Sequence, residues 1–478
     1  MYDAAIIGGG VCGAAIAMYL SKYELKCCLF EKENDIAMGT TKANSGIVHA
    51  GYDPEPGTLM ARLNVRGCEI TAELCAQMGV PFRKVGSLVL AFDNKDIEHI
   101  GRLYERGIAN GVRGMKLLNR EDLLEREPNL NPEVKGALYA PSAGVVNPWR
   151  LCIAMAETAA ENGVEFFLGS EVTNIEKTMG GFEITAGGKK YESAYVINAA
   201  GVYSDKIANM VGEYDFTVSP SKGQYYLLDK TQAGLVNSVV FQCPTERGKG
   251  VLVAPTADGN VIVGPNAESG SARDDCSTTR DGLNYVAAEA GRTTGKINYR
   301  ENIRSFAGLR ANTEHKDFII GESPVCRRFI NVAGIKSPGL TSAPAIGEYI
   351  ADVLKDCGLF MSRKSGWRIL EPKIRFAEMD DEQKAELCRR NPKYGNVICR
   401  CNTITEGEII DALNSRIPPR TLDGIKRRAG TGMGRCQGGF CGPRVHEIIC
   451  RHYGVPAESV LLDRNGSFIV CGKVGEQK

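Results

Sequence analysis

The chain lacks an excess of charge of either sign. Lys and Arg number 58 against 57 Asp and Glu, which leaves a net charge of +1 over 478 residues. A nucleic-acid surface needs a basic excess, so this balance argues against a nucleic-acid partner. The sequence also has no internal repeat and no low-complexity tract. With 43% hydrophobic residues it can form a packed core, which excludes wholesale disorder.

Long hydrophobic runs are missing too. The one stretch that resembles a targeting segment, Ala4–Leu20, has no basic flank, follows Asp3 and contains four glycines. We interpret it as a buried strand that enters a helix, not as a signal peptide or a membrane span. We therefore expect a soluble, cytoplasmic protein without an integral membrane segment.

Disulfide chemistry has little support, although the chain holds 17 cysteines. A chain of this length does not need disulfides to stabilise its core. The odd count, with Cys27 and Cys28 adjacent, favours reduced thiols. The 13 cysteines outside two C-terminal pairs form no C-x-x-C motif, which argues against a disulfide oxidoreductase.

Hydrophobic patterning divides the chain into stretches of different architecture. Up to about Gly201, short apolar runs alternate with helical patterns, which is typical of a parallel-sheet α/β domain. Between about Val202 and Arg310 the pattern changes to strands with Gly and Pro turns, which predicts an inserted, mainly antiparallel sheet. The predicted strands are Ala4–Ile7, Cys27–Phe30, Ser87–Ala91, Tyr195–Ala199, Gln224–Leu228, Val251–Ala254, Val261–Val263 and Phe329–Gly334, and the predicted helices are Val11–Leu20, Leu151–Asn162 and Thr341–Leu354.

Domain boundaries follow from these patterns. We expect residues 1–360 to form one α/β region, whose inserted sheet comes largely from about 80–140 and 202–310. Residues 361–395 are charged and polar, as a linker should be. A small helical module is expected over 396–455, followed by a tail over 456–478.

A glycine motif opens the first helix. Gly8-x-Gly10-x-x-Gly13 follows an apolar strand, and Glu31 ends the next strand eighteen residues after Gly13. Such glycines allow a tight turn and a close backbone approach, so that a pyrophosphate can lie at the helix N-terminus. The Glu31 carboxylate is placed to accept hydrogen bonds from ribose hydroxyls. The motif predicts dinucleotide binding, with an ordinary structural turn as the alternative.

Two later segments favour FAD over NAD, because a flavin needs more protein around it than one loop. Val196–Gly201 is a buried strand that ends in small residues, and Gly334–Thr341 is a second glycine-bearing turn from strand to helix. A helix N-terminus at the second turn would stabilise negative charge on a reduced flavin. Ordinary turns remain the alternative for both.

These three segments, in this order and spacing, resemble the D-amino-acid-oxidase-like superfamily of FAD oxidoreductases over about Met1–Leu359. The stretch Asn44-Ser-Gly-Ile-Val-His-Ala-Gly-Tyr52, followed by Pro56-Gly-Thr-Leu, is similar to the branch with soluble glycerol-3-phosphate oxidases and dehydrogenases and L-2-hydroxyglutarate oxidases. The resemblance implies a Rossmann-like FAD-binding domain with an inserted substrate domain. The FAD contacts that it implies are Gly8, Gly10, Gly13, Glu31, Lys32, Thr40, Thr41, Asn44, Ser45, Val172, Ala200, Gly201, Gly339, Leu340 and Thr341.

The same resemblance implies a pocket for a small anionic alcohol. His49, one of five histidines, would be the catalytic base or would orient the hydroxyl. Arg310 resembles the anion-binding arginine of the family, although a solvated surface charge is the alternative. The further substrate contacts that we predict are Ser45, Lys249 and Ser337, while Lys336 competes for the cationic role.

Four cysteines near the C-terminus form the pairs Cys399-x-Cys401 and Cys436-x-x-x-x-Cys441, with 34 residues between the pairs. Zinc sites usually pair cysteines as C-x2–4-C, so a C-x-C pair suits zinc poorly, whereas thiolates can hold an iron–sulfur cluster. The pairs resemble the bacterioferritin-associated-ferredoxin-like domain, which implies a [2Fe–2S] cluster. Zinc and unligated thiols remain alternatives. Thr405 with Glu408 predicts a capped helix beside them.

Together the resemblances imply FAD-dependent oxidation of sn-glycerol 3-phosphate to dihydroxyacetone phosphate, with hydride transfer to flavin N5. A one-electron cluster on the same chain favours a dehydrogenase over an oxidase, with electrons relayed to a second redox subunit or acceptor protein. An L-2-hydroxyglutarate, or other 2-hydroxy or amino acid, dehydrogenase of the same fold is the alternative. From other classes, a non-catalytic redox- or metal-sensing protein also remains open, and a nucleic-acid-modifying flavoprotein is disfavoured by the charge balance.

Overall fold

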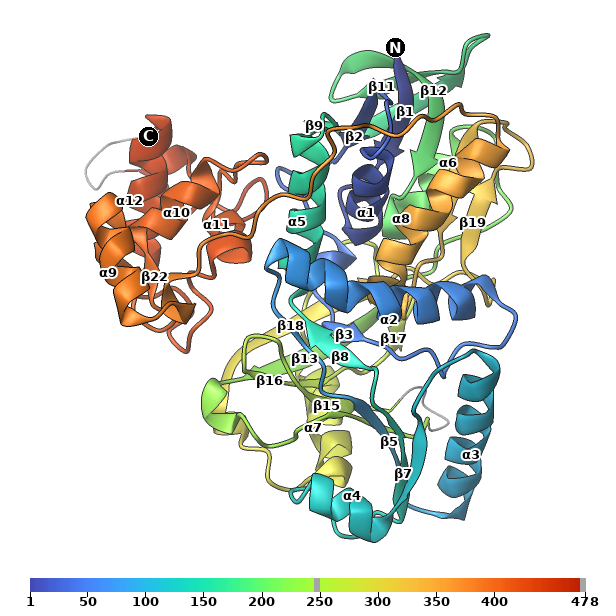
Figure 1. Cartoon of the computed structure of the whole chain (residues 1–478), viewed down its shortest axis with the longest axis vertical. Helices are drawn as coiled ribbons and strands as arrows, with labels where there is room; N and C mark the ends of the chain where they lie inside the picture. Colours follow the sequence, from blue (N-terminus) through green and yellow to red (C-terminus); the bar gives the residue numbers. More distant parts are fainter. Residues whose placement is uncertain (245–249, 473–478) are drawn as a thin grey trace.

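Two large sheets and a small helical module make up the molecule (Figure 1). The computed structural model describes residues 1–244 and 250–472. In Figure 1 the module, coloured orange to red, lies beside the first sheet, and the second sheet lies below the first. Among the described residues no helix is both long enough and apolar enough to cross a membrane.

The first sheet has eight strands around a parallel core in the order β9–β2–β1–β12–β20. Ala4 and Ile6 of β1 pack into one hydrophobic cluster, whereas Ala5 and Ile7 pack into another on the opposite face. Both faces are therefore covered, which explains why β1 is a continuous apolar run. The strands are β1 (Tyr2–Ile7), β2 (Cys27–Phe30), β9 (Glu165–Phe167), β10 (Val172–Lys177), β11 (Phe182–Ala186), β12 (Lys189–Asn198), β19 (Ile319–Glu322) and β20 (Phe329–Ala333).

Helices cover this sheet, and the helix after the glycine motif packs against two others. This first helix has the predicted bounds Val11–Leu20, and the helix predicted over Leu151–Asn162 is found over Pro148–Glu161. The helices of this region are α1 (Val11–Leu20), α2 (Leu59–Met78), α5 (Pro148–Glu161), α6 (Ser204–Asn209) and α8 (Gly339–Asp356). The single-turn 3-10 helices of the chain are η1 (Thr40–Lys42), η2 (Gly201–Tyr203), η3 (Lys230–Gln232), η4 (Tyr299–Glu301), η5 (Phe376–Glu378), η6 (Pro392–Gly395) and η7 (Ala457–Ser459).

The second sheet has nine strands, which are antiparallel to their neighbours except for the parallel pair β5–β14. They are β5 (Ser87–Ala91), β6 (Lys116–Asn119), β7 (Gly136–Ala140), β13 (Ser221–Leu228), β14 (Val239–Gln242), β15 (Leu252–Pro255), β16 (Val261–Gly264), β17 (Glu268–Ser269) and β18 (Asn302–Arg310). Helices α3 (Asn94–Ala109), α4 (Arg120–Arg126) and α7 (Arg280–Thr293) pack on it, and a three-stranded sheet joins β3 (Ile47–Val48), β8 (Gly144–Val146) and β4 (Phe82–Arg83).

The strand Ser87–Ala91 fits both predicted patterns, because its apolar run is part of the alternation that predicts the parallel sheet and it also lies within about 80–140, from which the inserted sheet is expected. As β5 it lies in the second sheet, between β7 and β14. A short, fully buried apolar run is the same pattern in either sheet, so periodicity alone does not assign it. The predicted fold class is confirmed: a Rossmann-like α/β domain with an inserted, mainly antiparallel sheet and a small helical C-terminal module.

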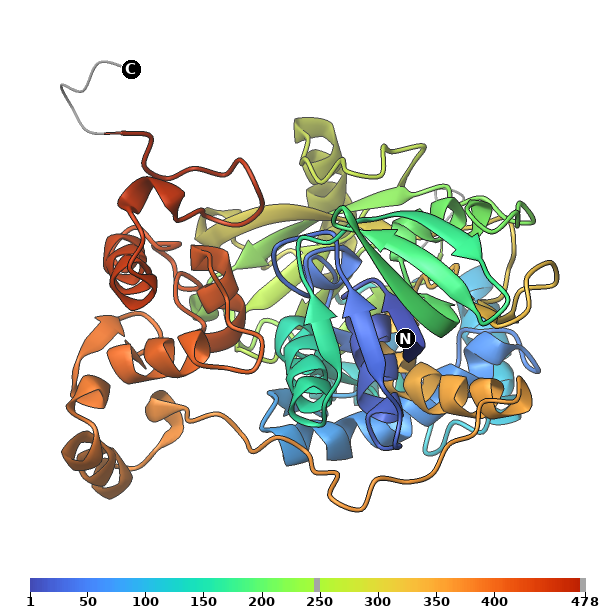
Figure 2. The ribbon, with the colours of Figure 1, turned by 90° about the horizontal axis from the view of Figure 1, so that it is seen from above.

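The C-terminal part begins with an extended segment that runs along the outside of the first sheet before it reaches the module (Figures 1 and 2). The expected linker is not entirely irregular, because Asp380 and Gln383 form a capping box that starts helix α9 (Asp381–Arg390). The module contains β21 (Val397–Cys399), β22 (Ile404–Thr405), α10 (Glu406–Leu413), α11 (Leu422–Ala429) and α12 (Gly442–Tyr453). The predicted capping box of Thr405 and Glu408 is present at α10.

Candidate functional site

A cavity of about 600 Å³ lies between the two sheets. Loops that follow the carboxyl ends of β1, β2, β12 and β20 line one part of it, and β13 and β18 of the second sheet supply Tyr225 and Arg310. In open α/β sheets, ligands bind outside the carboxyl ends of the strands. This cavity is therefore the candidate binding site.

The structure brings almost all of the residues predicted to bind FAD or substrate to this cavity. Two of them, Gly13 and Thr341, lie outside its lining, and Lys249 lies outside the described residues. The predicted residues that line the cavity are Gly8, Gly10, Glu31, Lys32, Thr40, Thr41, Asn44, Ser45, His49, Val172, Ala200, Gly201, Arg310, Ser337, Gly339 and Leu340.

The three glycines of the motif are required, or tolerated, for different steric reasons. A Cβ on Gly8 would lie 2.5 Å from the carbonyl oxygen of Ala199, and a Cβ on Gly13 would lie 1.9 Å from that of Gly8. A Cβ on Gly10 would meet only the Thr41 hydroxyl, at 3.4 Å, and Gly10 lines the cavity. Two glycines thus allow close backbone packing, and the third leaves the helix start accessible to a ligand.

Replacing Gly13 with alanine is expected to destabilise the fold by about 1–3 kcal/mol or more, because backbone must move to admit the methyl group. The variant should also lose bound flavin. Thermal melting and the flavin absorbance of the purified protein measure both effects. Gly101→Ala in α3 is the control: its Cβ would have no atom within 4 Å, so it should melt at or above the wild-type temperature. Wild-type stability and flavin content in Gly13→Ala would contradict the prediction.

Glu31, which directly follows β2, is hydrogen-bonded to the backbone of the glycine motif. Its carboxylate accepts hydrogen bonds from the backbone N–H of Gly9 at 2.6 Å and of Glu33 at 2.9 Å. Burial raises the pKa of Glu31, while these two N–H groups oppose the shift. A carboxylate can accept about four hydrogen bonds, so capacity remains for the ribose hydroxyls that the sequence predicts.

Two helix N-termini face the same cavity. Residues at the starts of α1 and α8, among them Gly10, Val11 and Gly339, line it. The N-cap residues Gly10 and Pro338 provide no side-chain cap, although the Thr41 hydroxyl accepts a hydrogen bond from the N–H of Val11, and neither helix has an acidic residue in its first turn. The helix dipoles therefore favour negative charge where these two helices begin. A dinucleotide with an anionic pyrophosphate, and a ring that gains negative charge on reduction, fits this arrangement.

His49 is fixed through its backbone. Its N–H donates to the Thr341 hydroxyl at 2.9 Å, and its carbonyl accepts from the Asn64 side chain at 2.8 Å. Its ring atom Nε2 lies 3.4 Å from the Ser337 hydroxyl, and the ring stacks on that of Phe241 with a centroid distance of 5.7 Å. Helices α2 and α8 therefore present this imidazole to the cavity.

The second sheet supplies the cationic side of the site. Arg310 ends β18, and its guanidinium donates two long hydrogen bonds, of 3.4 and 3.5 Å, to the Asn266 carbonyl. Burial raises the pKa of Tyr225, and the interactions of its hydroxyl with Arg310 and Ser45 oppose the shift. The ammonium group of Lys336, the competing cation, donates to the carbonyl of His315 at 2.9 Å.

Sequence reasoning missed several side chains of this site, chiefly Tyr225, Phe241 and Asn64. Asn64 did leave a signal, because helical periodicity places it with Gly67, Cys68 and Thr71 on the buried face of α2, where an amide is unusual. The two aromatic residues left none, since aromatic side chains on strands are ordinary core residues.

The four C-terminal cysteines lie in two pairs. The sulfur atoms of Cys401 and Cys436 are 3.8 Å apart, and the thiols of Cys399 and Cys441 are hydrogen-bonded to each other. This bond lowers the pKa of Cys399 and raises that of Cys441, and the backbone N–H of Gly432 points to both. Within residues 1–244 and 250–472, no three His, Cys, Asp or Glu side chains gather closely enough to hold one metal ion.

Comparison with known proteins identifies the larger part of the chain. Residues 3–353 match the family described as DAO, FAD dependent oxidoreductase. The chain belongs to the DAO family. Further along the chain, residues 397–451 match the BFD-like [2Fe-2S] binding domain. Both sequence resemblances are confirmed, so the chain is an FAD-dependent oxidoreductase with a [2Fe–2S] domain.

Three relatives illustrate the similarity. The chain is 49% identical over 473 residues to the glycerol 3-phosphate dehydrogenase of Caloramator mitchellensis, covering 99% of this chain and 98% of that protein. It is similar to the structure of L-alpha-glycerophosphate oxidase from Mycoplasma pneumoniae with FAD bound, with a TM-score of 0.72 and 33% identity over 77% of this chain and 97% of that one. It is also 29% identical to the mitochondrial L-2-hydroxyglutarate dehydrogenase of Homo sapiens, over 73% of this chain and 88% of that protein.

The geometry of this DAO-family chain fits both cofactors of its two domains. The cavity with its open glycine turn and the starts of two helices, neither with an acidic residue in its first turn, suits FAD. Two thiol pairs suit a two-iron cluster, in which each iron takes two thiolates, better than one tetrahedral zinc ion. Cys399, Cys401, Cys436 and Cys441 as the cluster ligands remain our prediction.

Proposed function

We propose that this chain oxidises sn-glycerol 3-phosphate to dihydroxyacetone phosphate as an FAD-dependent dehydrogenase that acts on a CH–OH group. One observation carries the proposal: a relative named glycerol 3-phosphate dehydrogenase is 49% identical along almost the whole of both chains. The cavity adds chemical support, because it is lined together by His49, Ser45, Ser337 and Arg310.

Oxidation of a secondary alcohol removes a hydride from carbon and a proton from the hydroxyl. Bound FAD supplies the hydride acceptor. His49 takes the hydroxyl proton, and Ser337, 3.4 Å from its Nε2, helps to orient the imidazole. The backbone contacts of His49 to α2 and α8 fix its position without using the ring nitrogens.

Arg310 binds the phosphate in this proposal. Its bonds to the Asn266 carbonyl are long and therefore weak, and a guanidinium can bind a phosphate with two parallel hydrogen bonds. The neighbouring hydroxyl groups of Tyr225 and Ser45 interact with each other and orient this end of the site.

Arg310→Ala should raise the concentration of glycerol 3-phosphate needed for half-maximal flavin reduction about tenfold or more, since a charge-assisted bond contributes roughly 1.5–3 kcal/mol. Arg310→Lys should recover only part of this loss, because an ammonium group lacks the planar fork. Anaerobic titration followed at the flavin band gives these concentrations. An unchanged half-maximal concentration in the alanine variant would assign the phosphate to another side chain.

We also propose that electrons leave through the C-terminal module to an acceptor protein. Cys401 is exposed, and Phe440, which directly precedes Cys441, is 85% exposed. An exposed aromatic ring beside predicted cluster ligands suits a contact with a second redox protein. This exit route supports a dehydrogenase rather than an oxidase.

Anaerobic absorption spectra with a substrate panel test the proposal. Glycerol 3-phosphate should bleach the flavin band, whereas L-2-hydroxyglutarate, glycerol and glycine should not do so at the same concentration. If L-2-hydroxyglutarate alone bleached the flavin, the chain would instead be assigned the activity of L-2-hydroxyglutarate dehydrogenase, to which it is 29% identical. The absence of bleaching by any member of the panel would favour the non-catalytic sensing function.

A further inference from the structure

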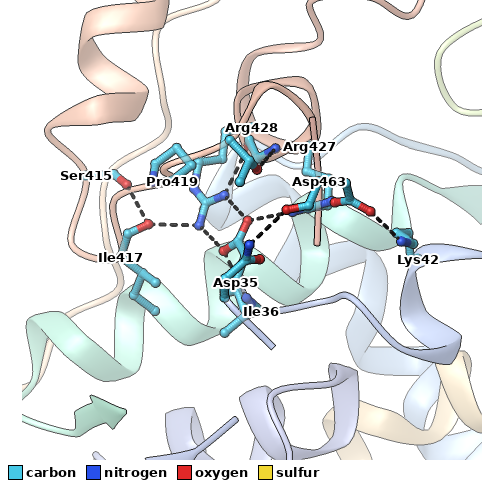
Figure 3. A network of polar contacts seen from close by, with 12 residues as sticks. Asp35, Ile36, Lys42, Ser415, Ile417, Pro419, Arg427, Arg428 and Asp463 are labelled. Carbon is cyan, nitrogen blue, oxygen red and sulfur yellow. Dashed lines mark hydrogen bonds and ion pairs between the residues drawn. The ribbon is translucent and has the colours of Figure 1, made fainter. Parts of the chain in front are cut away.

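A buried ionic network joins the C-terminal module to the FAD-binding domain (Figure 3). Asp35, in the loop after β2, is 2% exposed, and its carboxylate accepts hydrogen bonds of 2.8 Å from Arg427 and of 2.8 and 2.9 Å from Arg428. Both arginines belong to α11 of the module. Burial alone would raise the pKa of Asp35, but the two guanidinium groups hold it below its usual value.

A second carboxylate reaches the same part of the FAD-binding domain. Asp463 accepts hydrogen bonds from Arg427 and from Lys42, both at 2.7 Å, and its backbone carbonyl accepts from Asn34 at 2.8 Å (Figure 3). The C-terminal part of the chain therefore holds the segment 34–42 at both of its ends.

This segment surrounds the glycine motif. The N–H of Ala37 donates to the carbonyl of Gly9 at 2.9 Å, and the Thr41 hydroxyl accepts from the N–H of Val11 at 2.9 Å. Immediately before the segment, Glu31 accepts from the N–H of Gly9. The segment that the module holds is thus bonded on both sides of the helix start at which we predict the dinucleotide to bind.

On the module side, the arginines of the ionic network lie close in sequence to residues that contact the cysteines. Helix α11 ends at Ala429, and Gly432, three residues later, directs its N–H to the thiols of Cys399 and Cys441. Gly434 packs against Cys401, because a Cβ there would lie 2.3 Å from that of Cys401. A rearrangement of the cysteine loops is therefore transmitted over a few residues to Arg427 and Arg428.

We propose that cluster loading and FAD binding are coupled through this network, with Asp35 and Asp463 as positioning residues for the flavin. When the cysteine loops relax without iron, α11 shifts and leaves the Asp35 carboxylate buried without its partners. An unpaired buried charge is strongly unfavourable, so the segment 34–42 must move, and it then loses its bonds to the glycine motif. By linkage, each cofactor tightens the other by the same factor.

The test compares FAD affinity in the full-length chain with and without iron, and it uses no substrate, so it is independent of the proposed reaction. Iron is removed anaerobically with a chelator and reductant, and FAD release is followed by flavin fluorescence. Wild-type protein should bind FAD about tenfold more weakly without iron, within the roughly 5–150-fold range of known couplings. In Asp35→Asn, the affinities with and without iron should agree within about twofold.

Two further variants complete the experiment. Asp463→Asn, at a less buried carboxylate, should reduce the ratio and gives a folded test if Asp35→Asn does not fold. Glu161→Gln is the matched control: it removes the ion pairs of Glu161 in α5 with Arg416 of the module and with Arg368, away from the segment 34–42, and should keep the wild-type ratio. A wild-type ratio of one, or loss of the ratio in Glu161→Gln as complete as in Asp35→Asn, would overturn the coupling.

Discussion

His49→Ala should keep its FAD but lose flavin reduction by substrate, with a rate lower by about 10²–10⁴-fold, the usual contribution of a general base. FAD should stay bound because the contacts of His49 to Thr341 and Asn64 use its backbone, which alanine retains. Stopped-flow measurement of anaerobic flavin bleaching by glycerol 3-phosphate gives the rate, and the absorption spectrum gives the FAD content.

The control for this prediction is His315→Ala. This histidine is exposed, and the contact it offers to the site, the carbonyl that accepts from Lys336, belongs to its backbone. The variant should bleach at the wild-type rate. Bleaching of His49→Ala at that same rate would remove the catalytic assignment, whereas loss of FAD from it would show that the ring has a structural role.

Fold class and cofactors could be predicted from sequence because they depend on local patterns. The glycine motif needs a strand before it, a helix after it and an acid at the end of the next strand, and all three features lie within residues 2–31. The cysteine pairs are likewise short-range motifs. The substrate side of the cavity is less local: His49 and Arg310 meet there because the second sheet closes over the first, and sequence alone indicated this only through the family resemblance.

Other features could not be predicted, for identifiable physical reasons. The five-residue run of β5 fits a buried strand of either sheet, because both environments select the same apolar residues. Tyr225 reaches the site through its strand register, and an aromatic residue on a strand is more often part of the core. Asp35 and Arg427 are 392 positions apart, and each alone looks like a solvated surface charge until the docked module buries both.

This docking makes the flavin site and the C-terminal module parts of one unit. A linker alone would let the module move freely, but the buried carboxylate and two arginines between them favour one fixed arrangement. A fixed arrangement suits a chain in which electrons enter at one cofactor and leave at the other. It also means that cluster variants must be studied with FAD in excess, so that weaker flavin binding is not mistaken for a catalytic defect.

Under that condition, Cys401→Ser should separate the two halves of the reaction. The variant loses one of four predicted cluster ligands, so the visible absorption of the cluster and the bound iron should disappear. Flavin bleaching by glycerol 3-phosphate should continue within about twofold of the wild-type rate, because Cys401 lies outside the cavity. Turnover with a one-electron acceptor protein should fall to the background rate, since the exit route for the electrons is gone.

The control is Cys450→Ser, which changes a half-buried cysteine of α12 in the same module, whose sulfur lies 3.7 Å from Nδ1 of His446. It should keep iron, bleaching and turnover. If Cys401→Ser kept full turnover with the acceptor while lacking iron, electrons would leave directly from the flavin, and the module would serve only to hold the segment 34–42. If bleaching itself stopped at saturating FAD, the module would control access of substrate to the cavity, and the division into two half-reactions would fail.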